Sequence, residues 1–568
     1  MIGAAIDAQL QIETELKPVV GDTFNVASHL PAMAADRPEG TAVVVTLPGR
    51  GPNRYRRLSY AQLESLSNRY ANGLASMGIG AGVRTLVMVP PGVEFMALFF
   101  ALFKLRAVPV LIDPGMGLRQ MLGCIRSVKP AAMIAIPAAQ AVRKLRPAAF
   151  RSVRHAVTVG RRWFWGGPTL DELCEHSSDR FDMQPSRADD TAAILFTSGS
   201  TGPPKGVIYE HGMFASQVRL IGDHYGIKPG DVDLSAFPLF ALFGPALGMA
   251  CVFPDMNPSR PAEVDAAKLV RTICDQEANS AYGSPAVWRR VANYCLENKI
   301  TLPTLRRVLM AGAPVSWQLL DRLTRVLDPA ARIHIPYGAT EALPIASIGA
   351  REVLEETSRL SRAGAGTCVG QPVAGIEVRV IRLDENPITE WSDDLVRPTG
   401  EIGEIVVRGP VVTKQYYGLA DATARTKIAD GTTLWHRMGD VGYFDDRGRL
   451  WFCGRKVHRV VTASATMYSV QCEAIFNEHP DVYRSALVGL GPRGGQRPVV
   501  VIEPEPGRFP RGRRADSFRD ELLRLGQAAE LTRDIREVLF HHGFPVDVRH
   551  NVKIDREALA RWAAKRVP

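Results

Sequence analysis

Ten consecutive residues before the middle of the chain combine three glycines, four hydroxyl side chains and one lysine. They are Thr197, Ser198, Gly199, Ser200, Thr201, Gly202, Pro203, Pro204, Lys205 and Gly206. Glycines allow backbone N–H groups to approach phosphate oxygens closely, hydroxyls add hydrogen-bond donors, and a lysine adds a mobile positive charge. The apolar run 192–196 directly before them predicts a buried strand. The pattern therefore predicts a polyphosphate-binding loop at the end of a strand.

The spacing of this loop differs from that of P-loop nucleotide-binding proteins. Their motif ends in Gly-Lys followed by Ser or Thr, whereas Lys205 follows two prolines and precedes Gly206. A glycine-rich surface turn with an incidental lysine is the alternative interpretation. If the loop does bind a nucleotide, we expect chemistry of another kind than that of P-loop enzymes.

A second segment carries groups that suit a nucleotide. Its residues are Tyr337, Gly338, Ala339, Thr340 and Glu341. A planar ring can pack on a base, a hydroxyl can bond an α-phosphate, and a carboxylate can bind Mg²⁺, which prefers hard oxygen ligands. Upstream of this segment, the apolar run 308–310 predicts a strand that leads into a loop, 311–314. The chain thus presents two separate groups of candidate nucleotide-binding residues.

The two motifs resemble those of the adenylate-forming superfamily, which contains acyl-CoA synthetases, firefly luciferase and the adenylation domains of peptide synthetases. The segment 337–341 matches the family pattern Y-G-x-T-E letter for letter. The resemblance implies an α/β fold in which a large N-terminal domain has several subdomains with mainly parallel sheets, and a small, mobile C-terminal domain is α+β. It assigns residues 1–454 to the domain that binds ATP and the acyl substrate, and 455–568 to the lid.

The resemblance also implies roles for single residues, with ATP and Mg²⁺ as cofactors. The implied catalytic residues are Lys553, Thr340, Glu341 and Lys205, and the implied metal ligands are Glu341 and Thr201. The implied ATP-binding residues are Thr197, Ser198, Gly199, Ser200, Thr201, Gly202, Gly312, Ala313, Pro314, Tyr337, Gly338, Asp440 and Arg455. Asp440 follows Gly439 as in the family's ribose-binding G-D motif. Lys553 belongs to a segment that resembles G-K-I-x-R, with Val552 in place of the glycine.

The segment 237–244, with four phenylalanines among eight residues, is the candidate wall of an acyl pocket. Acyl-CoA synthetases typically have P-L-F-H-x-x-G here, and this chain has Ala241 in place of the histidine. Core packing alone would also account for the phenylalanines. By family analogy, the candidate pocket residues are His211, Phe240, Ala241, Phe243, Tyr282 and Gly283.

Three positions that relatives use for coenzyme A are altered. They are Ala241, the hinge residue Val457 in place of Asp or Lys, and the loop 462–466, which lacks the family's glycine. The adenylation motifs are intact, so we expect an acceptor already inside the pocket. A hydroxyl on the substrate's own β-carbon would qualify, because intramolecular attack gains a large effective molarity.

The chain as a whole resembles the β-lactone synthetases of bacterial long-chain olefin biosynthesis. That resemblance implies conversion of a 2-alkyl-3-hydroxy fatty acid and ATP to a β-lactone, AMP and pyrophosphate. It also implies assembly with other enzymes of the pathway, a β-lactone decarboxylase and a reductase. A long-chain fatty acyl-CoA ligase, an acyl-AMP ligase and a non-enzymatic scaffold descended from a ligase are the alternatives.

Composition and charge exclude several other classes of protein. The 568 residues exceed what one hydrophobic core usually supports, and the eight cysteines form no C-x-x-C pair, as in a reducing cytoplasm. The net charge of +10 comes largely from arginines that are not interleaved with aromatic residues, so we expect a solvated surface and no nucleic-acid binding. The uncharged segment 234–254 contains glycines and prolines, which favours a buried loop and helix lining an apolar pocket over a membrane span.

Overall fold

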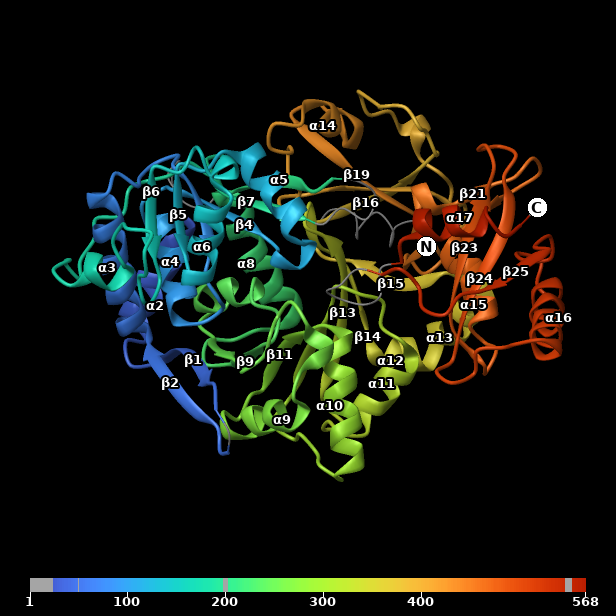
Figure 1. Cartoon of the computed structure of the whole chain (residues 1–568), viewed down its shortest axis with the longest axis horizontal. Helices are drawn as coiled ribbons and strands as arrows, with labels where there is room; N and C mark the ends of the chain where they lie inside the picture. Colours follow the sequence, from blue (N-terminus) through green and yellow to red (C-terminus); the bar gives the residue numbers. More distant parts are fainter. Residues whose placement is uncertain (1–23, 50, 198–202, 547–553, 568) are drawn as a thin grey trace, which may run out of the picture.

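The computed structural model describes residues 24–49, 51–197, 203–546 and 554–567. Two large sheets with their helices form most of the molecule, and a smaller unit made from the C-terminal residues lies beside them (Figure 1). The prediction of an α/β fold with a large N-terminal part and a smaller C-terminal part is confirmed.

The first sheet has the order β6-β5-β3-β4-β7-β8. Its strands are β3 (Arg84–Met88), β4 (Val108–Ile112), β5 (Ala132–Ala135), β6 (His155–Thr158), β7 (Thr191–Thr197) and β8 (Lys205–Glu210). All pairs are parallel except β7 with β8. The crossover helices are α4 (Val93–Lys104), α5 (Leu118–Val128) and α6 (Pro137–Leu145). β7 and β8 are the two strands that flank the predicted phosphate loop, so this sheet positions that loop.

The second sheet begins with a parallel block and continues as an antiparallel one. The parallel block comprises β1 (Thr41–Leu47), β10 (Ala250–Phe253), β9 (Val232–Ser235), β11 (Ser280–Gly283), β12 (Arg307–Met310) and β13 (Arg332–Ala339), with β2 (Arg54–Ser59) antiparallel at its edge. The antiparallel block comprises β14 (Ala342–Gly349), β15 (Thr367–Pro372), β20 (Leu450–Arg455), β19 (Thr433–Phe444), β17 (Gly403–Arg408) and β16 (Glu377–Ile381), with β18 (Lys427–Asp430) paired to β19. The predicted nucleotide motifs 337–341 and 439–440 therefore belong to one sheet.

The helix α8 (His211–Tyr225) packs between the two sheets (Figure 1). Its buried residues join a hydrophobic core that also contains residues of β5 and β7 from the first sheet and of β10 and β11 from the second. The helix α3 (Tyr60–Ser76) begins at a capping box in which Ser59 and Gln62 satisfy each other's backbone N–H groups. Further helices cover the parallel block: α9 (Ala266–Asp275), α10 (Pro285–Glu297) and α11 (Trp317–Thr324).

The C-terminal unit contains a three-stranded sheet, β23 (Val482–Leu490), β24 (Arg497–Pro504) and β25 (Glu537–Phe540), and a short hairpin, β21 (Val460–Val461) with β22 (Thr466–Met467). Its helices are α15 (Ser469–Phe476), α16 (Arg513–Gln527) and α17 (Arg556–Ala563). The described strands of this unit form no ladder with the two large sheets. This independence accords with the predicted α+β C-terminal part.

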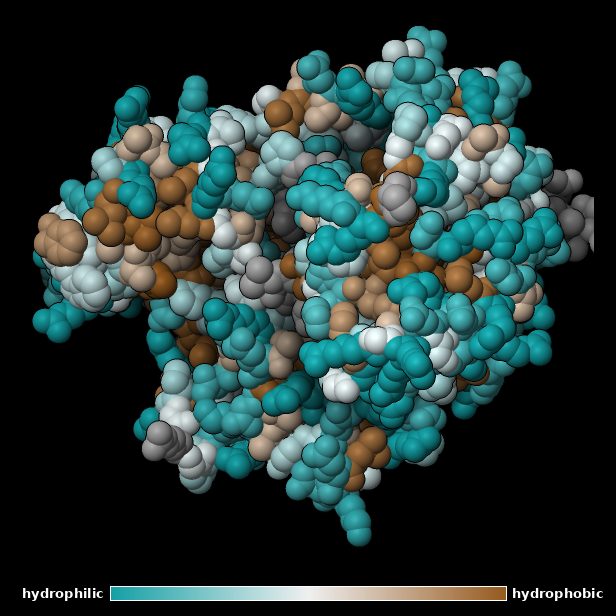
Figure 2. Space-filling model, turned by 45° about the vertical axis from the view of Figure 1, so that its right-hand side comes forward, coloured by the Kyte–Doolittle hydropathy of each residue, from teal (hydrophilic) through white to brown (hydrophobic). Residues whose placement is uncertain are grey.

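The uncharged segment 234–254 is folded as two short turns between strands, η4 (Phe240–Phe243) and η5 (Pro245–Leu247), which border an apolar cavity. Among the helices of the described residues, none combines the length and apolar composition needed to cross a membrane. The arginines in the segments 143–162 and 508–514 are largely exposed, as expected for a solvated surface. Hydrophilic side chains cover much of the face seen in Figure 2.

Candidate active site

Asp440 in β19 is the most buried carboxylate of the predicted nucleotide motifs, with an exposed fraction of 4%. The Tyr337 hydroxyl from β13 donates to its Oδ2 at 2.6 Å, and Arg455 Nη1 from β20 lies 2.9 Å from its Oδ1. Burial raises the pKa of the Asp440 carboxyl, and the Arg455 guanidinium opposes that rise. The three predicted residues therefore meet although they come from three strands.

The Oδ1 atom of Asp440 is buried and forms no hydrogen bond with the residues that the structure describes. The nearby Arg455 contributes charge to it without hydrogen-bond geometry. A buried acceptor without a partner costs free energy unless a ligand or water supplies a donor. A ligand hydroxyl at this position would supply one.

Glu341 lies in the turn between β13 and β14, and its Oε1 accepts a hydrogen bond of 2.8 Å from the Tyr416 hydroxyl. Its other carboxylate oxygen has no protein hydrogen bond or ion pair within the described ranges, which leaves it available to a cation. The Nζ atom of Lys205 lies 4.8 Å from the centroid of the same Tyr416 ring, so these two predicted catalytic residues share one neighbour. Sequence reasoning did not select Tyr416.

Tyr416 is held beside the first sheet by backbone bonds. Tyr417 N–H donates to the Gly206 carbonyl at 2.7 Å, and Val207 forms an isolated bridge with Tyr416. These contacts join the end of the predicted phosphate loop to the segment between β17 and β18.

Thr340 and Gly338 complete the predicted segment. The Thr340 carbonyl accepts a hydrogen bond of 2.5 Å from the Tyr209 hydroxyl, which fixes the backbone of the turn to β8. A Cβ atom at Gly338 would lie 2.7 Å from the Ala342 carbonyl oxygen, so the turn requires glycine there.

Lys427 in β18 is a further basic group close to Glu341. Its ammonium contacts the Thr413 carbonyl, and the Thr413 N–H donates to the Glu341 carbonyl at 2.9 Å. Burial lowers the pKa of Lys427 to about 7, although the negative charge of Glu341 opposes the shift. This residue too was not selected from the sequence, because its neighbours in the chain match no phosphate-binding pattern.

The loop with the predicted ATP-binding residues Gly312, Ala313 and Pro314 follows β12. Gly312 has a φ of +92° and, like Pro314, is exposed to solvent. The Ala311 N–H donates to the Gly283 carbonyl at 3.4 Å, so the loop starts beside the end of β11. Its position at the carboxyl ends of parallel strands is where α/β sheets commonly bind ligands.

Buried charges surround the start of the C-terminal unit. The Glu404 carboxylate, exposed by 2%, is paired with Arg437 Nη2 at 2.6 Å and with Lys456 Nζ at 2.9 Å. Arg437 also donates to the carbonyls of Asp384 and Asn386. Lys456 is the second residue of the predicted lid, so the start of the lid is anchored in the second sheet.

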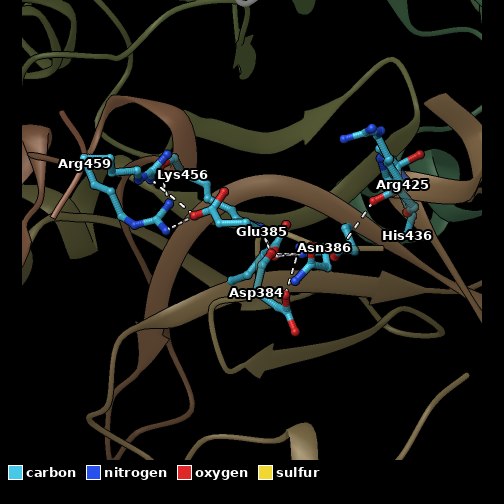
Figure 3. Close-up of polar contacts among 11 residues, drawn as sticks. Asp384, Glu385, Asn386, Arg425, His436, Lys456 and Arg459 are labelled. Atoms are coloured by element: carbon cyan, nitrogen blue, oxygen red, sulfur yellow. Dashed lines mark hydrogen bonds and ion pairs between the residues drawn. The ribbon is translucent and has the colours of Figure 1, made fainter. Parts of the chain in front are cut away.

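A second group of ion pairs lies next to this anchor. Glu385 is paired with Arg459 (Figure 3). Arg493 Nη2 lies 3.4 Å from the same carboxylate. The Arg459 guanidinium also donates to the Lys456 carbonyl at 2.6 Å. By contrast, the Val457 side chain is 53% exposed and takes part in no such network.

An apolar cavity lies next to these motifs. Pro336, Leu343 and Pro344, which flank the segment 337–341, form one side of it. Phe240 and Tyr282 form another, with their rings stacked at a centroid distance of 3.8 Å. Asp233 and Ser280 are its polar lining residues, and burial raises the pKa of the Asp233 carboxyl.

Some predicted residues lie away from this cavity. Phe240, Phe243 and Tyr282 line it, whereas Ala241 and Gly283 are buried and do not line it. His211 is 1% exposed and accepts a hydrogen bond from the Val26 N–H at its Nδ1; burial lowers its pKa to about 4. The predicted residues Ser198, Gly199, Ser200, Thr201, Gly202 and Lys553 lie outside the described residues, and of Thr197 only the backbone pairing with Lys205 is described.

The chain is similar to several known proteins. The model of the AMP-binding enzyme family matches residues 30–417. The olefin beta-lactone synthetases of Xanthomonas campestris pv. campestris and Stenotrophomonas maltophilia are 47% and 46% identical to this chain, each over 95% of this chain and 98% of their own. The anthranilate CoA ligase AuaEII in complex with anthranoyl-AMP has the same fold, with a TM-score of 0.78, 19% identity, and coverage of 96% of this chain and 99% of its own.

The chain therefore belongs to the AMP-binding enzyme family. The predictions of an adenylate-forming fold and of an ATP-dependent enzyme that forms an acyl-adenylate are confirmed.

Proposed function

We propose that this enzyme adenylates a 2-alkyl-3-hydroxy fatty acid and closes it to a β-lactone, with release of AMP and pyrophosphate. The supporting observation is that Asp440, Arg455 and Glu341 are close enough to interact electrostatically. An apolar cavity begins at the residues on either side of the segment 337–341. The relatives at 47% and 46% identity, named olefin beta-lactone synthetases, support the choice of reaction.

In the first step, a carboxylate oxygen of the substrate attacks the α-phosphorus of ATP, and the bond to the β,γ-pyrophosphate breaks. We propose that Asp440 Oδ1 accepts hydrogen bonds from the ribose, with Arg455 and Tyr337 holding the carboxylate in place. Lys205 and Lys553 would face the negative charge that develops on the phosphates, and Thr340 the α-phosphate. Glu341 and Thr201 would hold Mg²⁺, which when bound neutralises phosphate charge.

In the second step, the β-hydroxyl oxygen attacks the acyl carbon, the bond to the AMP oxygen breaks, and the hydroxyl proton leaves to solvent or a base. No second substrate has to enter for this step. Two features of the C-terminal unit favour it over thioester formation. The loop 462–466 forms a tight turn, with the Thr462 N–H donating to the Ala465 carbonyl at 2.9 Å, and the hinge position carries the exposed, uncharged Val457.

The deciding experiment supplies the enzyme with ATP, Mg²⁺ and a 2-alkyl-3-hydroxy fatty acid without coenzyme A. We expect the four-membered lactone by NMR together with one AMP and one pyrophosphate per turnover. A 2-alkyl fatty acid that lacks the 3-hydroxyl is the matched control, because it should form the adenylate and no lactone. AMP release that begins only when coenzyme A is added would instead identify an acyl-CoA ligase.

We further propose that the lid begins at the hinge dipeptide 454–455, so that residues 1–454 bind ATP and acid and residues 455–568 carry Lys553. A cytoplasmic location would suit the cysteines, which are free throughout the described ranges. Assembly with a β-lactone decarboxylase and a reductase would pass the reactive product on directly, and co-purification of the three enzymes tests it.

A further inference from the structure

A second apolar cavity lies on the other side of the turn η4 from the first. It is the smaller of the two cavities. Its lining is entirely apolar and includes Val26, Phe100, Phe103, Phe214, Val218 and Ala246. Phe243 borders both cavities, so its ring is part of the wall between them.

The helix α8 contributes one continuous face to both cavities. Phe214 and Val218 line the second cavity, and Ile221 and Tyr225 line the first. Spacings of four, three and four residues keep these side chains on the same side of an α-helix. The two cavities are therefore neighbours along α8, one turn apart.

Aromatic rings mark the boundary between them. Phe243 contacts Phe214, of the second cavity, at a centroid distance of 6.1 Å, and Phe240, of the first, at 5.8 Å. The next residue, Gly244, could not carry a side chain, because a Cβ atom there would lie 2.1 Å from Cys251 Sγ. The backbone at Gly244 therefore packs closely against Cys251 of β10, and this contact fixes the position of the neighbouring Phe243 ring.

A single unbranched hydrocarbon chain needs one apolar space, whereas two lie side by side here. A 2-alkyl-3-hydroxy fatty acid carries two chains that diverge from adjacent carbons, and long apolar chains gain about 0.8 kcal/mol for each CH₂ group removed from water. We propose that the two cavities are separate subsites for these two chains, with Phe243 as the divider that sets how the branched acid lies. This inference rests on the proposed function and specifies the shape of the substrate that the site accepts.

The test uses two matched substitutions on the same helix, Val218→Phe for the second cavity and Ile221→Phe for the first. Three substrates are compared by kcat/KM for pyrophosphate release: a parent acid with both chains short, one with only the 2-alkyl branch lengthened, and one with only the chain beyond C3 lengthened. We expect each variant to lose tenfold or more on one lengthened acid, and the two variants to lose it on different acids. Each loss is expressed relative to the kcat/KM of the same variant on the parent acid, so that a general loss of activity does not count as a loss of chain selectivity.

Losses by both variants on the same lengthened acid, or on neither, would overturn the inference. Val218→Leu and Ile221→Met, which add less volume, repeat the comparison if either phenylalanine variant fails to fold. Phe243→Ala should reduce the length preference for both chains at once. Lactone formation from the parent acid by the unsubstituted enzyme reports on the proposed function separately, so a failure there is distinguishable from a failure of the two subsites.

Discussion

The nucleotide end of this site consists of charged and polar side chains, whereas its acyl end consists of apolar ones. At the nucleotide end, charged groups such as Asp440, Glu404 and Lys456 are buried, and protein partners hold each of them. At the acyl end, aromatic and aliphatic side chains surround empty space, and the polar lining groups are Asp233 and Ser280. Removing one member of a buried ion pair leaves an uncompensated charge, whereas changing an apolar wall alters only volume. Substitutions at the first end should therefore affect stability and catalysis, and those at the second end selectivity.

The largest effect is expected from Glu404→Gln. The substitution leaves Arg437 and Lys456 buried without their shared carboxylate, which should reduce the free energy of unfolding by about 3–5 kcal/mol. Glu355→Gln is the matched control, because its pair with Arg351 is exposed and should contribute less than about 1 kcal/mol. Denaturant titration measures both. Equal losses would contradict the contrast between buried and exposed charge.

Lys553→Ala should slow formation of the acyl-adenylate by about 10²-fold or more, since it removes a charge proposed to face the transition state. ATP binding should remain within about threefold, because the remaining contacts come from the N-terminal part. Pyrophosphate release and equilibrium binding measure the two effects. Lys565→Ala, an exposed lysine of the same unit, serves as the control. An unaltered rate of pyrophosphate release would remove Lys553 from the mechanism.

We expect ATP binding to depend on pH through the protonation of Lys427. Its pKa of about 7 means that the free enzyme loses this positive charge as the pH rises through 7. Bound phosphate favours the protonated form and raises that pKa, so binding at pH 8 should take up a proton, and affinity should fall by up to about tenfold per pH unit above 7. Calorimetry in buffers of different ionisation enthalpy measures the uptake. Lys427→Met should abolish it; persistence in that variant would assign the proton to another group.

One substitution made at each end compares them directly. Tyr337→Phe removes a hydrogen bond to the buried Asp440 carboxylate and should raise KM for ATP by about tenfold. Tyr282→Phe removes a hydroxyl that has no hydrogen-bond partner among the described residues, and kcat/KM should stay within about threefold. Steady-state kinetics on the same acid gives both values. A larger effect at Tyr282 would show that its hydroxyl contacts the substrate.

Local sequence was enough to predict the elements and the class of enzyme. The apolar runs 192–196 and 308–310 correspond to β7 and β12, and the segment 337–341 begins at the end of β13. Such patterns are readable because a strand or a short motif depends on residues that are close in the chain. The order of these motifs along the chain indicated the family, and finding it required no knowledge of tertiary contacts.

Only the tertiary structure decided which side chains complete the site. Tyr416 meets Glu341 across 75 residues, and Tyr337 meets Asp440 across 103. Val26 and Val218 border one cavity although they are far apart in the chain. Lys427 has a perturbed pKa only because folding buries it beside Glu341. Burial, cavity shape and charge pairing are properties of how distant segments pack, and for that reason neither the charge network nor the second cavity could be predicted from the order of residues.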